Sequence, residues 1–176
     1  MIDLLKKLID VKLDHVNTVD LGIITKVDLQ KMRCNVKLKH KIQDKEIELF
    51  DVPIATLKFA DADILIAPQE GDVAVILFSK FELEEQLKNK DVVEVNELYK
   101  FSLNNAIVVA GIYTKTDSIP SLDKGQILIK NKDLSILMDK SSNKITLKAE
   151  IVYIDGDLRF KKIMGVDAGD GVWHKH

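Results

Sequence analysis

Apolar and polar residues alternate with a period of two through much of this chain, most clearly after Gly125. Side chains of a strand point alternately to its two faces, so each alternating run predicts a strand with one apolar and one polar face. The intervening residues 131–133 and 139–143 are Asn, Asp, Ser and Lys, which favour turns. Three strands are therefore predicted, with apolar positions at Ile127 and Ile129, at Leu134, Ile136 and Met138, and at Ile145, Leu147, Ala149 and Ile151.

Nothing else in this C-terminal stretch is predicted to cover the apolar faces of those strands. No apolar stripe with helical spacing occurs there, and strands this short are unstable in water on their own. Identical faces can cover one another when symmetry brings copies of one chain together. The pattern therefore predicts that residues 125–176 assemble from several copies of the chain.

The middle of the chain carries a second group of short strands. Residues 28–31 predict a hairpin, and residues 68–72 predict a turn, because Pro68 fixes φ and Gly71 accepts a positive φ. Five short strands with tight connections favour a small closed barrel over a sandwich. These five strands are predicted at 21–27, 34–42, 46–54, 63–68 and 72–78, and a further strand at 101–111 is expected to lead out of the barrel.

Two short helices and one linker complete the predicted organisation. Residues 2–13 predict an amphipathic helix that docks on its own or a neighbouring subunit, and residues 81–88 predict a helix that plugs or covers the barrel. The only linker-like stretch begins at Thr114. The predicted parts are thus an N-terminal helix at 1–16, a barrel at 17–113, a linker at 114–124 and an assembling C-terminal part at 125–176.

Composition narrows the class of protein. The 176 residues are 46% hydrophobic and 31% charged with a net charge of −2, which predicts a folded, soluble chain without general affinity for nucleic acid or anionic membranes. Neither a signal peptide nor an apolar run long enough to span a membrane is recognised, so synthesis in the cytoplasm is expected. The single cysteine, Cys34, excludes an intramolecular disulfide and is predicted to be a packed strand thiol.

The chain ends in a pair of histidines with metal-ligand chemistry. His174 and His176 are two residues apart, so on an extended strand both imidazoles point to the same side. Three chains meeting on an axis would bring six imidazole nitrogens together, which suits an octahedral transition-metal ion. A terminal His-Lys-His can also be a solvated tail or a vector remnant. Its position at the end of a symmetric strand array favours the metal.

The motifs resemble those of one family when they are taken in order. They are Pro53-Ile-Ala-Thr-Leu-Lys-Phe, Ile64-Leu-Ile-Ala-Pro-Gln-Glu-Gly-Asp-Val-Ala-Val-Ile-Leu-Phe-Ser and Phe101-Ser-Leu-Asn-Asn-Ala-Ile-Val-Val-Ala-Gly. The chain resembles the central-spike proteins of contractile-tailed phages, the membrane-piercing tail tips of phage Mu and its relatives. The resemblance spans residues 19–111, and the terminal His-x-His agrees with it. One departure is Asn104-Asn105, where relatives more often carry Asn or Ser followed by Asp; another is a short apical domain.

That resemblance implies an all-β homotrimer with a barrel of the oligonucleotide/oligosaccharide-binding (OB) type, followed by an intertwined triple-stranded β-helix. It implies one iron ion per trimer on the three-fold axis, held at the tip by His174 and His176 of each chain. It also implies a place at the baseplate tip of a virion or tail-like particle. The implied partners are a hub or tube protein of the tail above the barrel and the outer membrane of the host bacterium.

An enzyme is not predicted, because no catalytic constellation is found. His40 lies on a predicted strand without a Ser or Cys placed as its nucleophile, and residues 165–171 lack a phosphate-loop pattern. We therefore expect no small-molecule substrate. Two carboxylate pairs beside glycines are compatible with an additional cation, although ordinary Asp-Gly turns are the commoner explanation. These pairs are Asp155 with Asp157 and Asp167 with Asp170.

Two other functions compete with membrane piercing. A nucleic-acid-binding barrel stacks bases on exposed aromatic residues beside a basic groove. Aromatic residues make up only 6% of this chain and its net charge is negative, so nucleic-acid binding is not expected. A passive structural tail or adaptor protein would use the same trimer without acting on a membrane. The sequence favours the piercing tip through the resemblance and the terminal histidines.

Overall fold

A computed structural model describes residues 2, 6, 16–95 and 100–157 of the chain. The chain divides into two compact units, Met1–Ser118 and Ile119–His176, called here the barrel unit and the C-terminal unit. The division falls inside the stretch that was predicted as a linker. Residues 16–95 and 100–157 form ten strands, one α-helix of five residues and one 3-10 helix, so the predicted all-β class is confirmed. Among them, no helix is long and apolar enough to cross a membrane.

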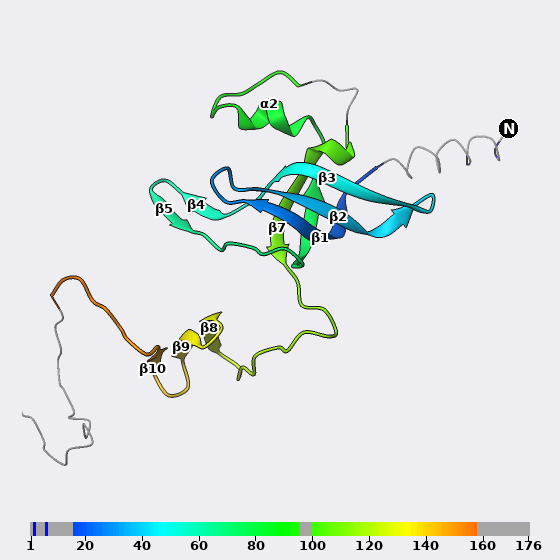
Figure 1. Cartoon of the computed structure of the whole chain (residues 1–176). Helices are drawn as coiled ribbons and strands as arrows, with labels where there is room; N and C mark the ends of the chain where they lie inside the picture. Colours follow the sequence, from blue (N-terminus) through cyan, green and yellow to red (C-terminus); the bar gives the residue numbers. More distant parts are fainter. Residues whose placement is uncertain (1, 3–5, 7–15, 96–99, 158–176) are drawn as a thin grey trace, which may run out of the picture. The chain divides into compact units, whose positions relative to one another are not determined.

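The barrel unit is built on a five-stranded antiparallel sheet with the order β3-β2-β1-β6-β7. The two edge strands meet, because Ile54 at the end of β3 forms a parallel bridge with Val108 of β7. Ala55 also donates its N–H to the carbonyl of Val108 at 2.8 Å. The sheet therefore curls into a partly open barrel (Figure 1). Its strands are β1 (Val19–Asp28), β2 (Arg33–Ile42), β3 (Lys45–Pro53), β6 (Val73–Phe78) and β7 (Ala106–Gly111).

Alternate residues of these strands fill the barrel, as their period of two predicts. Ile24, Val36 and Ile76 are the largest fully buried side chains. Gly22 lies between two of them, since a Cβ atom there would stand 2.2 Å from Cγ1 of Val36 and 2.7 Å from Cδ1 of Ile76. Cys34 is also buried in this core, as predicted. The core of the barrel unit is thus complete within one chain.

The predicted assignment of the fifth barrel strand was wrong. Residues 63–68 do not enter the sheet; only β5 (Ala62–Ile64) forms there, and it pairs with β4 (Leu57–Phe59) in a separate hairpin. Ile54 and Ala55 pair with β7 instead, which leaves Leu65 without a neighbouring strand. The fifth barrel strand is β7, which was expected to lead out of the barrel. The predicted turn at 68–72 is present, with Gly71 at a φ of 93°.

The connection from β6 to β7 contains both helices of the described chain. The predicted helix at 81–88 is confirmed as α2 (Leu83–Leu87), whose Leu83 is buried. The strand predicted at 101–111 starts only at Ala106, because the chain first forms a 3-10 helix, η2 (Leu103–Asn105). Ser102 caps η2 by accepting the N–H of Asn104. Asn105 is buried and accepts the N–H of Leu83, which joins the start of α2 to the start of β7.

The C-terminal unit contains an antiparallel meander of three strands, β8 (Gln126–Asn131), β9 (Leu134–Asp139) and β10 (Lys144–Lys148). The three predicted runs are therefore confirmed as strands, although the third was predicted to reach Ile151 and its strand ends at Lys148. Both predicted turns are present. Asp139 orders the second one by accepting the N–H of Ser141 at 2.8 Å and its hydroxyl at 2.7 Å. The hydrogen bond from the Ser141 hydroxyl keeps the pKa of Asp139 well below its ordinary value.

Almost all of the predicted N-terminal helix at 2–13, and residues 158–176, lie outside the part of the chain that the structure describes.

Candidate functional site

One face of the C-terminal meander is aliphatic or thioether in character except for Asn131, which pairs with Leu134 at its end. The strand register places Ile127, Met138 and Ile145 in one row across the sheet, and Ile129, Ile136 and Leu147 in the next. Paired residues of neighbouring strands point to the same side, so these rows form one surface. We call this surface the apolar sheet face; its seven residues are Ile127, Ile129, Leu134, Ile136, Met138, Ile145 and Leu147.

The opposite face of the meander is mostly polar. Only Leu128 and Leu137 interrupt it, and they are neighbours in the central row. This arrangement is typical of a sheet with one buried and one solvated side. The polar residues there are Gln126, Lys130, Ser135, Asp139, Lys144, Thr146 and Lys148.

The apolar sheet face has no cover within a single chain as far as the structure describes it. Six of its seven side chains are 39–67% exposed, the least exposed being Ile136 in the central strand. Contiguous exposed apolar surfaces of this kind are typical of association sites. Its side chains carry no acid, base or nucleophile, so the surface acts by packing.

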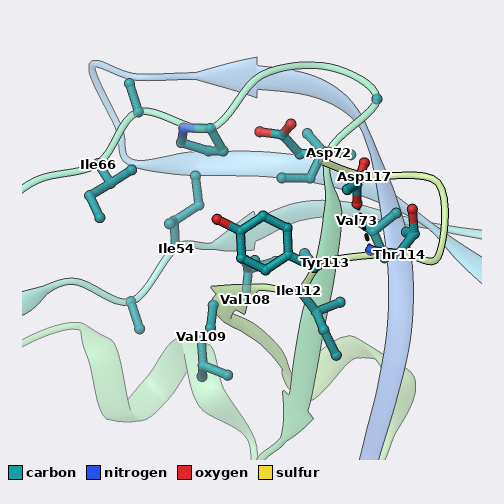
Figure 2. A pocket seen from close by; sticks show the side chains of 18 of the residues that line it. Ile54, Ile66, Asp72, Val73, Val108, Val109, Ile112, Tyr113, Thr114 and Asp117 are labelled. Carbon is teal, nitrogen blue, oxygen red and sulfur yellow. Dashed lines mark hydrogen bonds between the residues drawn. The ribbon is translucent and has the colours of Figure 1, made fainter. Parts of the chain in front are cut away.

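A second apolar surface lies in the barrel unit. An open groove of about 1390 Å³ runs between the β4–β5 hairpin with its following loop and the chain that leaves β7. Figure 2 shows Ile54, Ile66, Val108 and Tyr113 among the side chains arranged around it. We call this surface the barrel groove; the residues used below are Ile54, Ile66, Val73, Val108, Ile112 and Tyr113.

The charged residues of the barrel groove fall into two kinds. Asp72 accepts the N–H of Gln69 at 2.7 Å, and Asp117 accepts the N–H of Thr114 at 2.5 Å, so both carboxylates stabilise turns. The hydrogen bond from Thr114 lowers the pKa of Asp117. Lys39 and Lys115 also line the groove, and neither forms a hydrogen bond or an ion pair within the described chain. The charged groups that line the groove are therefore two lysines and two aspartates.

The predicted metal ligands, His174 and His176, lie outside the described residues, as do Asp167 and Asp170. Asp155 and Asp157 are described and exposed, on either side of Gly156, whose φ is 134°. Within the described residues, no group of three or more His, Cys, Asp or Glu side chains is placed to hold a metal ion.

His40 and Cys34, whose side chains were considered as reactive groups in the sequence, both have structural roles. Nδ1 of His40 lies 3.2 Å from a carboxylate oxygen of Asp20 on the neighbouring strand. Burial raises the pKa of the Cys34 thiol to about 11, so the unreactive thiol form is favoured.

Sequence analysis missed the barrel groove and the exposed β4–β5 hairpin beside it. The groove is lined by segments that lie far apart in the sequence, so no local pattern indicates it. The hairpin gives a weak signal, since Leu57 and Phe59 alternate with Lys58 over only three residues. Comparison of the sequence with models of protein families and with curated proteins finds no match.

Proposed function

We propose that this protein is the central spike of a contractile tail, a non-enzymatic homotrimer that pierces the outer membrane of a bacterium when the tail contracts. The apolar sheet face carries this proposal. Three copies related by an axis bury that face completely when each turns it inward, whereas one copy leaves it in water. The polar face of each meander then forms the outside of the shaft.

Burial of the apolar sheet face supplies a large driving force for assembly. Each large aliphatic side chain contributes roughly 1.5–3 kcal/mol when it is buried. Six of the seven side chains of the face are 39–67% exposed in one chain, so assembly supplies roughly half of this contribution for each of them, and dissociation of the trimer is expected to be very slow. In the proposed spike the sheets form the triple-stranded β-helical shaft, and hydrogen bonds of the backbone resist load along it.

The barrel unit supports the same proposal. Its five strands, with the two edges of the sheet meeting at Ile54 and Val108, have the arrangement of a partly open OB-type barrel. Such a barrel is the part of the spike family that faces the tail. We infer that a hub or tube protein of the tail binds above it, and that the assembled protein lies at the baseplate tip of a virion or tail-like particle.

The proposal includes a metal ion at the tip, and this part of it is inferred from the sequence. His174 and His176 of three copies would hold one iron ion on the axis, and the ion would cross-link three chain ends that otherwise fray. A cross-linked tip is stiff at its narrowest point, which a membrane-piercing device requires.

The mass of the native particle in solution, measured by light scattering together with its metal content, tests this function. A trimer with about one transition-metal ion per three chains is expected, and a monomer at micromolar concentration would exclude the spike. Titration against single-stranded DNA at several salt concentrations separates the spike from a nucleic-acid-binding barrel, whose affinity would fall steeply with salt. Imaging of tail particles that carry the labelled chain then tests its position at the distal tip.

A further inference from the structure

The β4–β5 hairpin carries an uncovered apolar face of its own. Leu57 pairs with Ile64 and Phe59 pairs with Ala62, so these four side chains lie on one face of the hairpin. Phe59 is 82% exposed. The hairpin projects away from the barrel sheet (Figure 1). Aromatic side chains that seat in a pocket supply much of the binding energy of protein interfaces, so an exposed phenylalanine on a projecting hairpin is a candidate anchor.

The barrel groove is the complement of this projection in both shape and polarity. It is concave, and Ile54, Val108 and Tyr113 line it (Figure 2). The base of the hairpin forms part of one wall, through Leu57 and Ile64, but Phe59 does not line the groove. A groove and a projection on one chain are what a cyclic assembly uses, because each copy in a ring meets its neighbour through two different surfaces.

Both surfaces carry charged side chains. The hairpin tip bears Asp61, and Asp63 follows on β5; no ion pair engages either within the described chain. The groove is lined by the lysines Lys39 and Lys115 and also by Asp72 and Asp117, whose carboxylates are held in turns. A lysine of the groove that meets Asp61 would fix the register between the two surfaces.

We propose that the tip of the β4–β5 hairpin, led by Phe59, seats in the barrel groove of the neighbouring copy. This inference rests on the proposed trimer and names the surfaces through which its barrels meet. Three identical contacts of this type close a ring of barrels. The barrel end of the particle then has an interface of its own, in addition to the one made by the apolar sheet face.

A photoreactive benzoylphenylalanine in place of Phe59, in the full-length chain, tests the contact directly. The matched control places the same group at Phe50, another phenylalanine that is 69% exposed but lies on β3 and does not line the groove. Irradiation of the purified protein should give covalent dimers and trimers from position 59, and few or none from position 50. Peptide mapping should place the bond on residues 54–57, 64–68 or 108–117 of another copy.

Light scattering on the same samples separates the possible failures. A trimer whose cross-links from position 59 are absent, lie within one chain or map to other surfaces would overturn the hairpin contact and leave the spike intact. A tail protein that captures position 59 while the pure trimer gives no cross-links between copies would assign the hairpin tip to that partner and also overturn the contact. A monomer would overturn both proposals.

Hydrogen exchange gives an independent measurement on the same interface. In the variant Phe59→Ser, amides of residues 108–117 should exchange about tenfold faster or more, which is the change that loss of one buried phenylalanine permits. Phe50→Ser should leave them unchanged. Equal exchange in the two variants would contradict the contact, provided that both remain trimeric.

Discussion

Replacement of Ile136 by lysine is the most direct test of the apolar sheet face. Ile136 occupies the central strand of the meander, between Ile129 and Leu147 of the neighbouring strands. In a trimer its side chain lies in the middle of the shaft. The substitution removes an apolar group and introduces an ammonium ion that must be buried without a partner.

The expected effect is large because symmetry repeats it three times. Ile136 is 39% exposed in one chain, so its burial on association contributes roughly 0.6–1.2 kcal/mol per chain, hence roughly 2–4 kcal/mol per trimer. Since about 1.4 kcal/mol corresponds to a factor of ten, loss of this contribution alone should lower the association constant by at least about one order of magnitude. Desolvation of the three ammonium ions costs several kcal/mol more for each. The conservative variant Ile136→Val, which removes one methylene group, should lower the stability of the trimer by only about 0.5–1.5 kcal/mol per chain.

Sedimentation velocity over a range of protein concentrations, combined with thermal unfolding, measures both quantities. The matched control is Thr146→Lys, which lies on the polar face of β10 opposite Leu137. It should sediment as the wild type does. If Ile136→Lys remains a trimer with unchanged thermal stability, the face is not buried between copies and the basis of the proposed function is lost. If both lysine variants dissociate, the trimer does not depend on which face of the sheet carries the lysine, and the inferred burial of the apolar sheet face is wrong.

Three further predictions concern other parts of the chain. The double variant His174→Ala/His176→Ala should contain no transition metal in elemental analysis while remaining a trimer. Acidification below about pH 6.5 should release the ion from the wild type, because only neutral imidazole binds a metal. Gly22→Ala should destabilise the barrel unit by roughly 1–3 kcal/mol in thermal unfolding, because its Cβ would stand 2.2 Å from a methyl carbon of the fully buried Val36; an unchanged unfolding temperature would contradict the packing. The pKa of Cys34 is raised from 9.0 to about 11 in the folded state, so the stabilisation due to the buried neutral thiol is present below pH 9 and is lost as pH rises towards 11. Chemical denaturation should therefore show a steeper loss of stability above pH 9 in the wild type than in Cys34→Ala, and identical pH profiles would contradict the burial of the thiol.

The strands were predictable wherever one face of a strand is apolar and the other is polar. The period of two indicated β2 and the three strands of the C-terminal unit, whereas short apolar runs between turn residues indicated β1, β3 and β6. The apolar sheet face follows from the same pattern, because antiparallel pairing of adjacent runs places Ile129, Ile136 and Leu147 in one row.

The predictions that failed needed information that no local sequence pattern contains. Residues 63–68 have an apolar run as strong as that of a barrel strand, but a strand also needs a neighbouring strand. The place beside β7 is taken by Ile54 and Ala55, which precede β4 and pair with Val108. That contact joins residues far apart in the sequence. The same closure creates the barrel groove, so the error in the fifth strand and the missed groove have one physical cause.

The two units differ in what each needs in order to fold, and this difference bears on assembly. The barrel unit buries Ile24, Val36 and Ile76 within one chain, so part of its core forms before copies meet. The C-terminal meander leaves its apolar face in water until copies meet, and a three-stranded sheet without a covered face has little stability. A barrel that folds first exposes the hairpin tip and the groove while the meander is still unpaired. Association of barrels through these surfaces would raise the effective concentration of the three meanders about the axis, since they are then tethered to one particle. In this order of events the hairpin contact promotes assembly of the shaft, and the buried sheet faces make the assembly long-lived.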